Sequence, residues 1–471
     1  MSNPSDPPEV TIASAISATL EGEHEKAVWA MRWLMRVHPD WVSHFDNHPS
    51  GEVRLNFQHA KAEGSRAQEV QKLCSILGRG GTRLEPFQRK TIDRILAIAW
   101  DAWEKGERPR PRGATLFEGG DVLTPEAMKG IKLAVVMPRY VHGNPAYIES
   151  DHFYHLAKSA EAAGLSVTQF EADEISYDHT VDDHKPAPTR PLDESLAELT
   201  RFLDIVRPDV VAFEANFEPT ANSIGNAYWN EQKRRLGFKL VAEIADSYDF
   251  ANKQGYQFFQ IHRWRDCVDQ FLLFHELSLQ RVGIENVVLA PCLPFWEGSF
   301  DPNAAKDIGI CTIGSLTRGR ELWLRPLVAS GAPVLNIMHD RSRRMAPNRE
   351  EYNSYLARAR MTFNNGYLSE YVRLATGRFF EGVLSRALVF EEAGDPVDLF
   401  FEPYIHYVPV ANVHQLIAFT WFFDEAEEWR KRIVDAAYDW MTTRYHSSKT
   451  WGRICGRLGL GARQQQAASA E

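Results

Sequence analysis

Several features that would assign a chain to a common class are missing here. The 471 residues include only five cysteines, and no CxxC pair occurs among them. That spacing fits neither a zinc cage nor a disulfide framework. No apolar segment approaches the roughly 20 residues needed to cross a bilayer, and the first residues show no basic region followed by an apolar run. We therefore expect a cytoplasmic protein without a transmembrane segment.

An excess of positive charge is also missing. The formal net charge is -10, which argues against nucleic acid as the main partner, because phosphate binding rewards clustered Lys and Arg. No Walker loop, GxGxxG or GxSxG motif occurs, which weakens the ATPase, dinucleotide-dependent dehydrogenase and α/β-hydrolase interpretations. What is present is an ordinary globular composition, with 44% apolar residues and enough length for two or three domains.

The N-terminal part of the chain has a helical pattern. In residues 1–113, apolar residues recur at helical spacing over 11–36, 52–80 and 85–105, and a stretch rich in Pro and Arg follows. We expect an all-helical extension. It would pack on the first Rossmann-like domain described next, form a homodimer contact, or dock a partner protein.

The rest of the chain alternates between strand and helix patterns. Continuous apolar runs such as Ile131–Met137 predict strands buried on both faces, and their alternation with helices predicts parallel sheets. The expected strands are 131–137, 164–170, 209–213, 239–244, 267–274, 286–289, 307–313, 334–337, 361–363 and 387–390. We therefore expect an α/β fold with two Rossmann-like domains, over 114–297 and 298–445. A C-terminal helix and tail would follow over 446–471.

The most specific local pattern is a Gly-containing turn that opens a helix at 376–382. Backbone N–H groups and the helix dipole favour an anion there, and Arg378 in the first turn can hold a phosphate as a bidentate fork. Glu381 lies three residues further on the same helix face, where its carboxylate can accept hydrogen bonds from two ribose hydroxyls. The alternative is a solvated Arg378–Glu381 surface pair, which is common and weak.

Residues 307–455 resemble the C-terminal domain of CgeB-like glycosyltransferases of the family 1 type. The shared features are the Gly-containing loop at 313–320, the helix with Arg378 and Glu381 that leads into a short strand, and the segment Tyr407–Leu416, in which Gln415 replaces the usual Glu. The resemblance implies a GT-B fold of two Rossmann-like domains. It also implies a nucleotide-sugar donor in the second domain and no requirement for a metal.

The resemblance implies which loop residues meet the donor. Gly314 would allow close backbone approach to the donor phosphates, while Arg318 and Arg320 would neutralise the leaving diphosphate in place of Mg²⁺. A basic turn facing solvent is the alternative. His339, after the next strand, is a candidate contact to the base or the sugar. We expect a UDP- or GDP-sugar as donor, with no metal ion and no further cofactor.

The first Rossmann-like domain is expected to bind the acceptor and to supply a base. Deprotonating an acceptor hydroxyl requires a positioned base, and four residues near the ends of strands are candidates: His142, His152, Glu214 and Asp246. Each has an ordinary alternative as a helix cap or a hydrogen-bonded loop residue. The stretch 178–184 contains Asp and His in a metal-like composition. No regular structure is expected around it, so we predict a solvated loop.

These patterns leave three hypotheses. The first is sugar transfer from a nucleotide-sugar to a hydroxyl of a glycan, lipid or protein. The second is a nucleotide-sugar epimerase with the same architecture. The third is a non-catalytic binding module whose helical extension recruits a partner. The fold alone does not choose among them, because function depends on the site.

Overall fold

The computed structural model describes most of the two α/β units and parts of the helical extension. The residues that it describes are 8–21, 27, 31, 45, 48–50, 53–54, 57, 69–77, 84–106, 122–140, 149–172, 191–214, 224–244, 264–273, 287–289, 295–315, 318–339, 348–365, 367–369, 372–373, 376–393 and 396–461. Within these ranges no helix is long and apolar enough to span a membrane. The cysteines that they include are free thiols.

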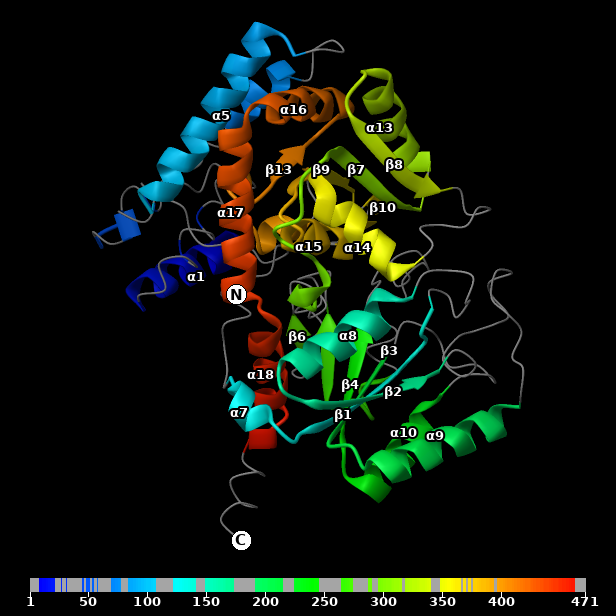
Figure 1. Ribbon diagram of the computed structural model, residues 1–471. Helices are drawn as coiled ribbons and strands as arrows, with labels where there is room; N and C mark the ends of the chain where they lie inside the picture. Colours follow the sequence, from blue (N-terminus) through cyan, green and yellow to red (C-terminus); the bar gives the residue numbers. More distant parts are fainter. Residues whose placement is uncertain are drawn as a thin grey trace.

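The first α/β unit is built on a six-stranded parallel sheet (Figure 1). In spatial order its strands are β2 (Ser166–Glu171), β1 (Lys132–Met137), β3 (Val210–Glu214), β4 (Lys239–Ile244), β5 (Gln270–Leu273) and β6 (Val287–Leu289). Its helices are α7 (Pro125–Met128), α8 (Asp151–Ala162), α9 (Leu192–Val206) and α10 (Asn226–Leu236). Every residue of β1 after Lys132 is buried, as expected for a parallel strand covered on both faces. The continuous apolar run therefore predicted this strand correctly.

The second α/β unit repeats this plan on a five-stranded parallel sheet. In spatial order its strands are β13 (Val408–Val410), β12 (Leu388–Glu392), β9 (Ala359–Asn364), β7 (Ile308–Ser315) and β8 (Val334–His339). Its helical elements are α13 (Arg318–Ala329), α14 (Arg349–Arg358), α15 (Gly377–Leu384) and the short η5 (Pro396–Leu399), and η4 (Glu297–Ser299) precedes it. A short antiparallel ribbon of β10 (Tyr367–Ser369) and β11 (Val372–Arg373) was not expected. Its strands are too short to give a periodic pattern.

Strand order reverses once in each sheet, between β1 and β3 in the first and between β7 and β9 in the second. In such sheets, ligands bind beyond the carboxyl ends of the strands at the point of reversal. The two units lie one above the other, with α8, α14 and α15 between the two sheets (Figure 1). This is the GT-B arrangement of two Rossmann-like units, and the predicted fold class is confirmed.

Three helices close the chain, and the last of them returns to the first unit. α16 (Val413–Glu425) and α17 (Glu427–Arg444) pack on the second unit, and α18 (Ser447–Arg457) packs on α8. Trp451 Nε1 in α18 donates a hydrogen bond to Ser159 Oγ at 2.9 Å. Glu297 accepts hydrogen bonds from the backbone N–H and the hydroxyl of Ser447, at 2.6 and 2.8 Å. α18 therefore links the first unit to the end of the second.

One described helix of the extension, α5 (Pro86–Glu104), packs on the second unit. The extension also includes α1 (Pro8–Leu20), and α5 buries Ile92 and Leu96 in one core with Phe419 of α16. The side-chain amide of Gln415 donates to the carbonyl oxygen of Cys74 at 2.8 Å, which an ionised Glu could not do. The expectation that the extension packs on the first Rossmann-like domain is therefore wrong for α5, because its apolar face matches α16. A homodimer contact and partner docking stay predictions.

Candidate functional site

Two arginines converge on Gly314 near the carboxyl end of β7. The φ angle of Gly314 is 120°, in the region that L side chains rarely adopt. A Cβ atom at this position would lie 3.0 Å from Nη1 of Arg378 and 3.5 Å from Nη1 of Arg320. Both guanidinium groups therefore approach the backbone of this loop closely, and the glycine makes that approach possible.

The two guanidinium groups are close enough to repel one another. The charge of Arg378, and then burial, lower the pKa of Arg320 to about 9, which leaves Arg320 charged at neutral pH. The helices α13 and α15 both begin at this edge of the sheet, and helix N-termini add partial positive charge. An anion between the arginines would relieve the repulsion, and a diphosphate has the charge and the oxygen atoms to do so.

Two asparagines at the end of β9 hold the arginines in place. Arg320 Nε donates to Asn365 Oδ1 at 3.2 Å, and Arg378 Nε donates to Asn364 Oδ1 at 3.3 Å. Asn364 Nδ2 in turn donates to both carboxylate oxygens of Glu391 at 2.8 Å, across the register pair between β9 and β12. The Nε atoms thus serve for positioning, while the Nη1 atoms face Gly314.

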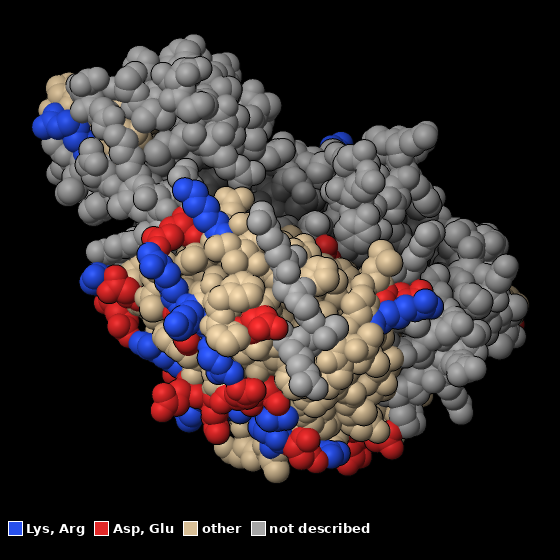
Figure 2. Space-filling view, turned by 90° about the horizontal axis from the view of Figure 1, so that it is seen from above, with Lys and Arg blue, Asp and Glu red and all other residues tan. Residues whose placement is uncertain are grey.

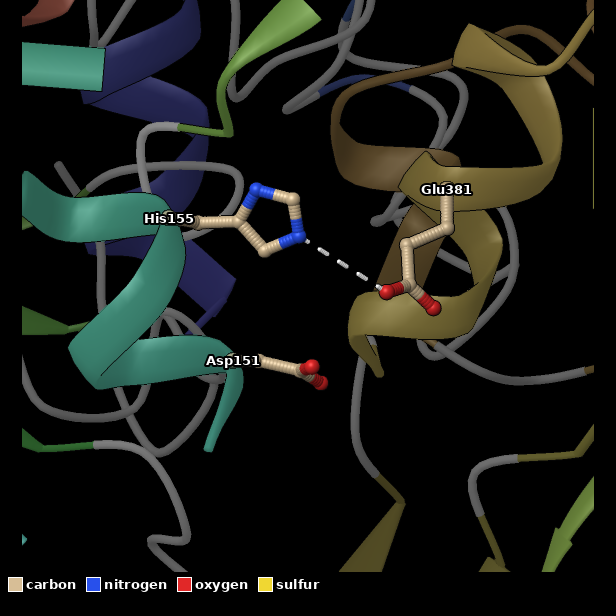
Figure 3. A group of neighbouring side chains, drawn as sticks. All are labelled: Asp151, His155 and Glu381. Atoms are coloured by element: carbon tan, nitrogen blue, oxygen red, sulfur yellow. Dashed lines mark ion pairs between the residues drawn. The ribbon is translucent and has the colours of Figure 1, made fainter. Parts of the chain in front are cut away.

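Between the two units, Asp151 and His155 of α8 point toward Glu381 of α15 (Figure 3). One nitrogen or oxygen atom from each lies within 4.8 Å of the others. His155 and Glu381 are fully buried, with His155 Nε2 at 4.0 Å from Glu381 Oε1. The alternative of a solvated Arg378–Glu381 surface pair is therefore wrong, because the Glu381 carboxyl does not reach the surface.

Arg349 and Tyr352 of α14 complete this interdomain cluster. Arg349 pairs with Asp151, and its Nη1 lies 3.6 Å from Glu381 Oε1. The Tyr352 hydroxyl donates to Glu381 Oε2 at 2.6 Å. Burial, and then the Asp151 carboxylate, raise the pKa of Glu381 to about 8. Burial would also raise the pKa of Asp151, but the charge of Arg349, the neighbouring histidines and the hydrogen bond from Arg349 together hold this pKa below its usual value.

At neutral pH the interdomain cluster therefore holds one ionised and one protonated carboxyl group around a single guanidinium. Arg349 belongs to the second unit and Asp151 to the first, so this ion pair joins the two units. Asp151 is the first residue of α8 and Arg349 is the first residue of α14, so this contact lies where the two helices begin.

The geometry of His155 argues against a metal in the interdomain cluster. The backbone N–H of Trp296 donates to His155 Nδ1 at 3.3 Å, so Nε2 of the neutral ring carries the proton. Burial, and then Arg349, lower the pKa of His155 to about 3, which keeps the ring neutral. The proton on Nε2 blocks the lone pair that a metal ion would need on the side facing Glu381, and Arg349 already supplies a positive charge.

In the first unit, His152 lies beside carboxylates near the ends of β3 and β4. Its Nδ1 is 2.6 Å from Oε1 of the buried Glu243, and Glu214 is the register partner of Glu243 on β3. Burial lowers the pKa of His152, but Glu243 and then Glu214 outweigh it and raise the pKa to about 10. His152 is therefore an imidazolium at neutral pH. It can donate a proton or stabilise a charge, whereas a base must come from a neighbouring carboxylate.

The structure brings together some of the predicted site residues and leaves others undescribed. Gly314, Arg320 and Arg378 meet at one point, and Glu381 faces the first unit on the same helix as Arg378. The side chains of Arg318, at the start of α13, and of His339, at the end of β8, are not described. His142, Asp246 and residues 178–184 lie outside the described part of the chain altogether.

The sequence analysis missed Arg349, Tyr352, Glu243 and Asn364. Nothing in the sequence links Arg349 to Asp151, because the two belong to different units. Glu243 and Asn364 carried a usable signal. Each is a polar residue at or next to the end of a buried parallel strand, where ligands of such sheets bind.

Comparisons with known proteins found similar solved structures but no matching family. No family model and no curated protein matches the sequence. Among solved structures, HepE from Anabaena in complex with UDP-glucose is similar over 69% of this chain and 99% of its own, at 9% identity and a TM-score of 0.46. Sucrose-phosphate synthase from Thermosynechococcus elongatus is similar over 72% and 100%, at 15% identity and a TM-score of 0.44. A mutant of BGT from phage T4 with UDP-glucose is similar over 69% and 98%, at 12% identity and a TM-score of 0.42.

One face of the molecule, seen from above the second unit, carries charges of both signs (Figure 2). Lys and Arg side chains alternate there with Asp and Glu side chains over the described residues. The described part of this face therefore shows no continuous basic patch of the kind that binds nucleic acid. This agrees with the formal net charge of -10.

Proposed function

We propose that this chain is a glycosyltransferase that binds a nucleotide-sugar donor at the carboxyl edge of its second sheet. The observation that carries the proposal is the convergence of Arg320 and Arg378 on Gly314. Two like charges held this close are stabilised by a bound diphosphate, and a diphosphate is also the leaving group of sugar transfer. Cationic side chains then stabilise the leaving group in place of Mg²⁺, so the reaction is metal-independent.

The other donor contacts come from residues around the same edge. Glu381, on the same helix as Arg378, is the proposed ribose contact. Its carboxyl is buried against His155 in the arrangement seen here, so a ribose hydroxyl would reach Oε1 only after α8 and α15 move apart. Arg318 is the first residue of α13, and it stays a proposed contact of the diphosphate. His339 ends β8, beside Ser315 in the register of β7, where a base or sugar would lie. The donor is a UDP- or GDP-sugar, and we assign the chain to the CgeB-like, hexosyl-transferring type.

The acceptor hydroxyl would bind beside Glu214 in the first unit. We propose Glu214 as the general base, because it ends β3 at the point of strand reversal and is partly exposed. His152 is charged at neutral pH and would hold the neighbouring carboxylates rather than accept a proton. His142 and Asp246 stay predictions. The acceptor is a hydroxyl of a glycan, lipid or protein.

Donor turnover tests this function. The chain is incubated in EDTA with UDP-glucose, UDP-N-acetylglucosamine or GDP-mannose, and the released nucleoside diphosphate is measured. We expect slow release from one donor by hydrolysis, lowered at least tenfold in Arg378→Ala, because the charge that stabilises the leaving group is lost. Arg325→Ala is the matched control, since Arg325 is an exposed arginine of α13 that pairs with Glu321. Release that requires added Mg²⁺ would contradict metal independence.

Product analysis of the same reactions separates the alternatives. A nucleotide-sugar epimerase would convert the donor sugar into its epimer without an acceptor. A non-catalytic module would bind a nucleotide or a partner protein and release nothing. The domain boundaries at 113/114, 297/298 and 445/446 and the cytoplasmic location stay predictions alongside this function.

A further inference from the structure

A pocket lies at the junction of the two units, where the connecting segment passes between α8 and α14. It encloses about 730 Å³, which is within the range of small-molecule sites. Its walls come from three separate parts of the chain: Tyr154 of α8, residues 296–307 and residues 349–358. Neither Gly314 nor the two arginines beside it line this pocket, so it is separate from the proposed diphosphate site.

One wall of the junction pocket is aromatic. Tyr154 and Trp296 are partly exposed, and their ring centroids are 6.1 Å apart. The indole of Trp296 lies over Gly298 so closely that a Cβ atom there would come within 2.8 Å of Cε2. The glycine therefore permits this position of the ring. Aromatic faces of this kind offer apolar surface next to polar groups, which suits the C–H face of a sugar ring.

A buried amide lies in the part of the wall that α14 forms. Asn353 is 7% exposed, and its amide nitrogen donates to the carbonyl oxygen of Ser299 at 3.2 Å. Its Oδ1 accepts no hydrogen bond from any described residue. Oδ1 has almost no accessible surface as the side chain is placed, so a ligand would reach it only when the Asn353 amide turns toward the pocket. A buried acceptor without a donor is costly, and that cost favours the turn. A sugar hydroxyl in the pocket would then donate to Oδ1.

The charges around the junction pocket favour a neutral ligand. The two arginines that line it are both paired, Arg349 with Asp151 and Arg358 with Asp307. The carboxylates of Asp301 and Glu350 line the same pocket. Positive charge is therefore not in surplus here, in contrast to the Gly314 loop, and a phosphate would be disfavoured. Carboxylates and amides beside aromatic rings suit a ligand with many hydroxyl groups.

We propose that the junction pocket binds a neutral saccharide. The sugar ring lies against Trp296 and Tyr154, and one of its hydroxyls donates to Asn353 Oδ1. Because the walls belong to both units and to the segment that connects them, a bound saccharide stabilises the arrangement of the two units seen here. The saccharide is either a terminal unit of the acceptor, which rests on the proposed transferase function, or a separate ligand with the same chemistry.

Titration of the full chain with single sugars tests the pocket. Glucose, galactose, mannose and N-acetylglucosamine are added one at a time, and binding is followed by saturation-transfer NMR. We expect at least one to bind at millimolar concentration, and Trp296→Ala and Asn353→Ala each to weaken it at least tenfold. Phe87→Ala removes an aromatic ring that is 49% exposed on α5 and should leave binding unchanged. Thermal unfolding confirms that each variant is folded.

The outcomes separate the pocket from the proposed function. No sugar binding to the wild type, or binding that persists in both pocket variants, overturns the pocket. UDP and GDP binding are measured on the same samples, and their absence contradicts the nucleotide site without touching the pocket test. Incubation of the bound sugar with the donor identifies its source. A glycosylated product seen by mass spectrometry identifies an acceptor, whereas binding without product identifies a separate ligand, and either result supports the pocket.

Discussion

At three points in the described part of the chain, a buried or half-buried charged side chain lies beside another charged group. Arg320 lies beside Arg378, Arg349 lies against Asp151, and His152 lies against Glu243. The last two are paired charges of opposite sign, which is the usual way to keep an ion away from water. The first is a pair of like charges, which folding alone does not favour. The Glu391 carboxyl offsets part of this repulsion, and a bound diphosphate would add further negative charge.

Glu381→Gln should make the stability of the chain less dependent on pH. The pKa of Glu381 is raised from 4.5 to about 8 in the folded chain. Its protonated carboxyl therefore contributes stability fully below pH 4.5, and that contribution is lost as the pH rises through 8. Gln cannot ionise and keeps the shape of the side chain. Between pH 4.5 and 8, the free energy of unfolding of the variant should therefore rise relative to that of the wild type by at least about 1.4 kcal/mol, the value of one pKa unit.

Urea unfolding of both proteins at pH 5 and at pH 8 measures this difference. Glu350→Gln is the control, because Glu350 is an exposed carboxyl on α14. An equal change in the free energy of unfolding for Glu381→Gln and wild type would show that the carboxyl is ionised throughout.

Glu214→Gln should abolish the chemical step while leaving donor binding intact. If Glu214 removes the acceptor proton, its loss should lower turnover by about 10²–10⁴-fold, the usual contribution of a general base. The affinity for the nucleotide should not change, because the donor lies on the other unit. Glu171→Gln is the matched control, since Glu171 is an exposed carboxylate at the end of β2 on the same sheet edge. Normal turnover by Glu214→Gln would remove Glu214 from the mechanism.

At the scale of helices and strands, the sequence pattern predicted those elements whose position depends on residues close together in the chain. β1, α9 and the start of α15 lie where apolar runs, helical spacing and a Gly-containing turn placed them. The ribbon of β10 and β11 was missed, because its hydrogen bonds join strands of three and two residues. The position of Arg378 in the first turn of α15 could be predicted from the Gly-containing turn, whereas its role as a phosphate contact stays a prediction. The pairing of Arg349 with Asp151 could not be predicted, because it depends on how the two units meet.

Gly382→Ala should destabilise the second unit. A Cβ atom on Gly382 would lie 2.8 Å from Thr362 Cγ2 and 2.9 Å from Val389 Cγ2, both on stiff β-branched side chains of the sheet beneath α15. Relief of that overlap should cost about 1–3 kcal/mol in the free energy of unfolding. Gly225→Ala is the control, since nothing lies within 4 Å of its Cβ position. Thermal unfolding measures both, and an unchanged Tm for Gly382→Ala would contradict this packing.

At the scale of the molecule, three features of the described residues join the two units. α18 returns from the second unit to α8, Glu297 in the connecting segment binds the start of α18, and Arg349 pairs across the junction. The junction pocket lies on the same boundary. The relative position of the units, and with it the distance between the proposed donor site and Glu214, depends on these contacts.

Arg349→Ala should loosen the junction. The substitution leaves Asp151 without its partner and removes the only charge of α14 that pairs with the first unit among the described residues. We expect a larger radius of gyration in small-angle X-ray scattering and a lower free energy of unfolding. The loss should be smaller than for a fully buried ion pair, because the Asp151 side chain is 38% exposed. Arg358→Ala is the control, because Arg358 is exposed and pairs with Asp307 beside its own helix. An unchanged radius of gyration would show that α18 and the connecting segment suffice.

The most direct test of the central claim is calorimetric titration of the chain with UDP and GDP in the absence of metal. The account predicts micromolar binding of one of them, at least tenfold weaker binding to Arg378→Ala, unchanged binding to Arg325→Ala, and much weaker binding of the matching nucleoside, which lacks the diphosphate. That result would place the donor diphosphate between Arg320 and Arg378 and would name the base. Binding of neither nucleotide would contradict the transferase function and would favour a module that binds a partner protein.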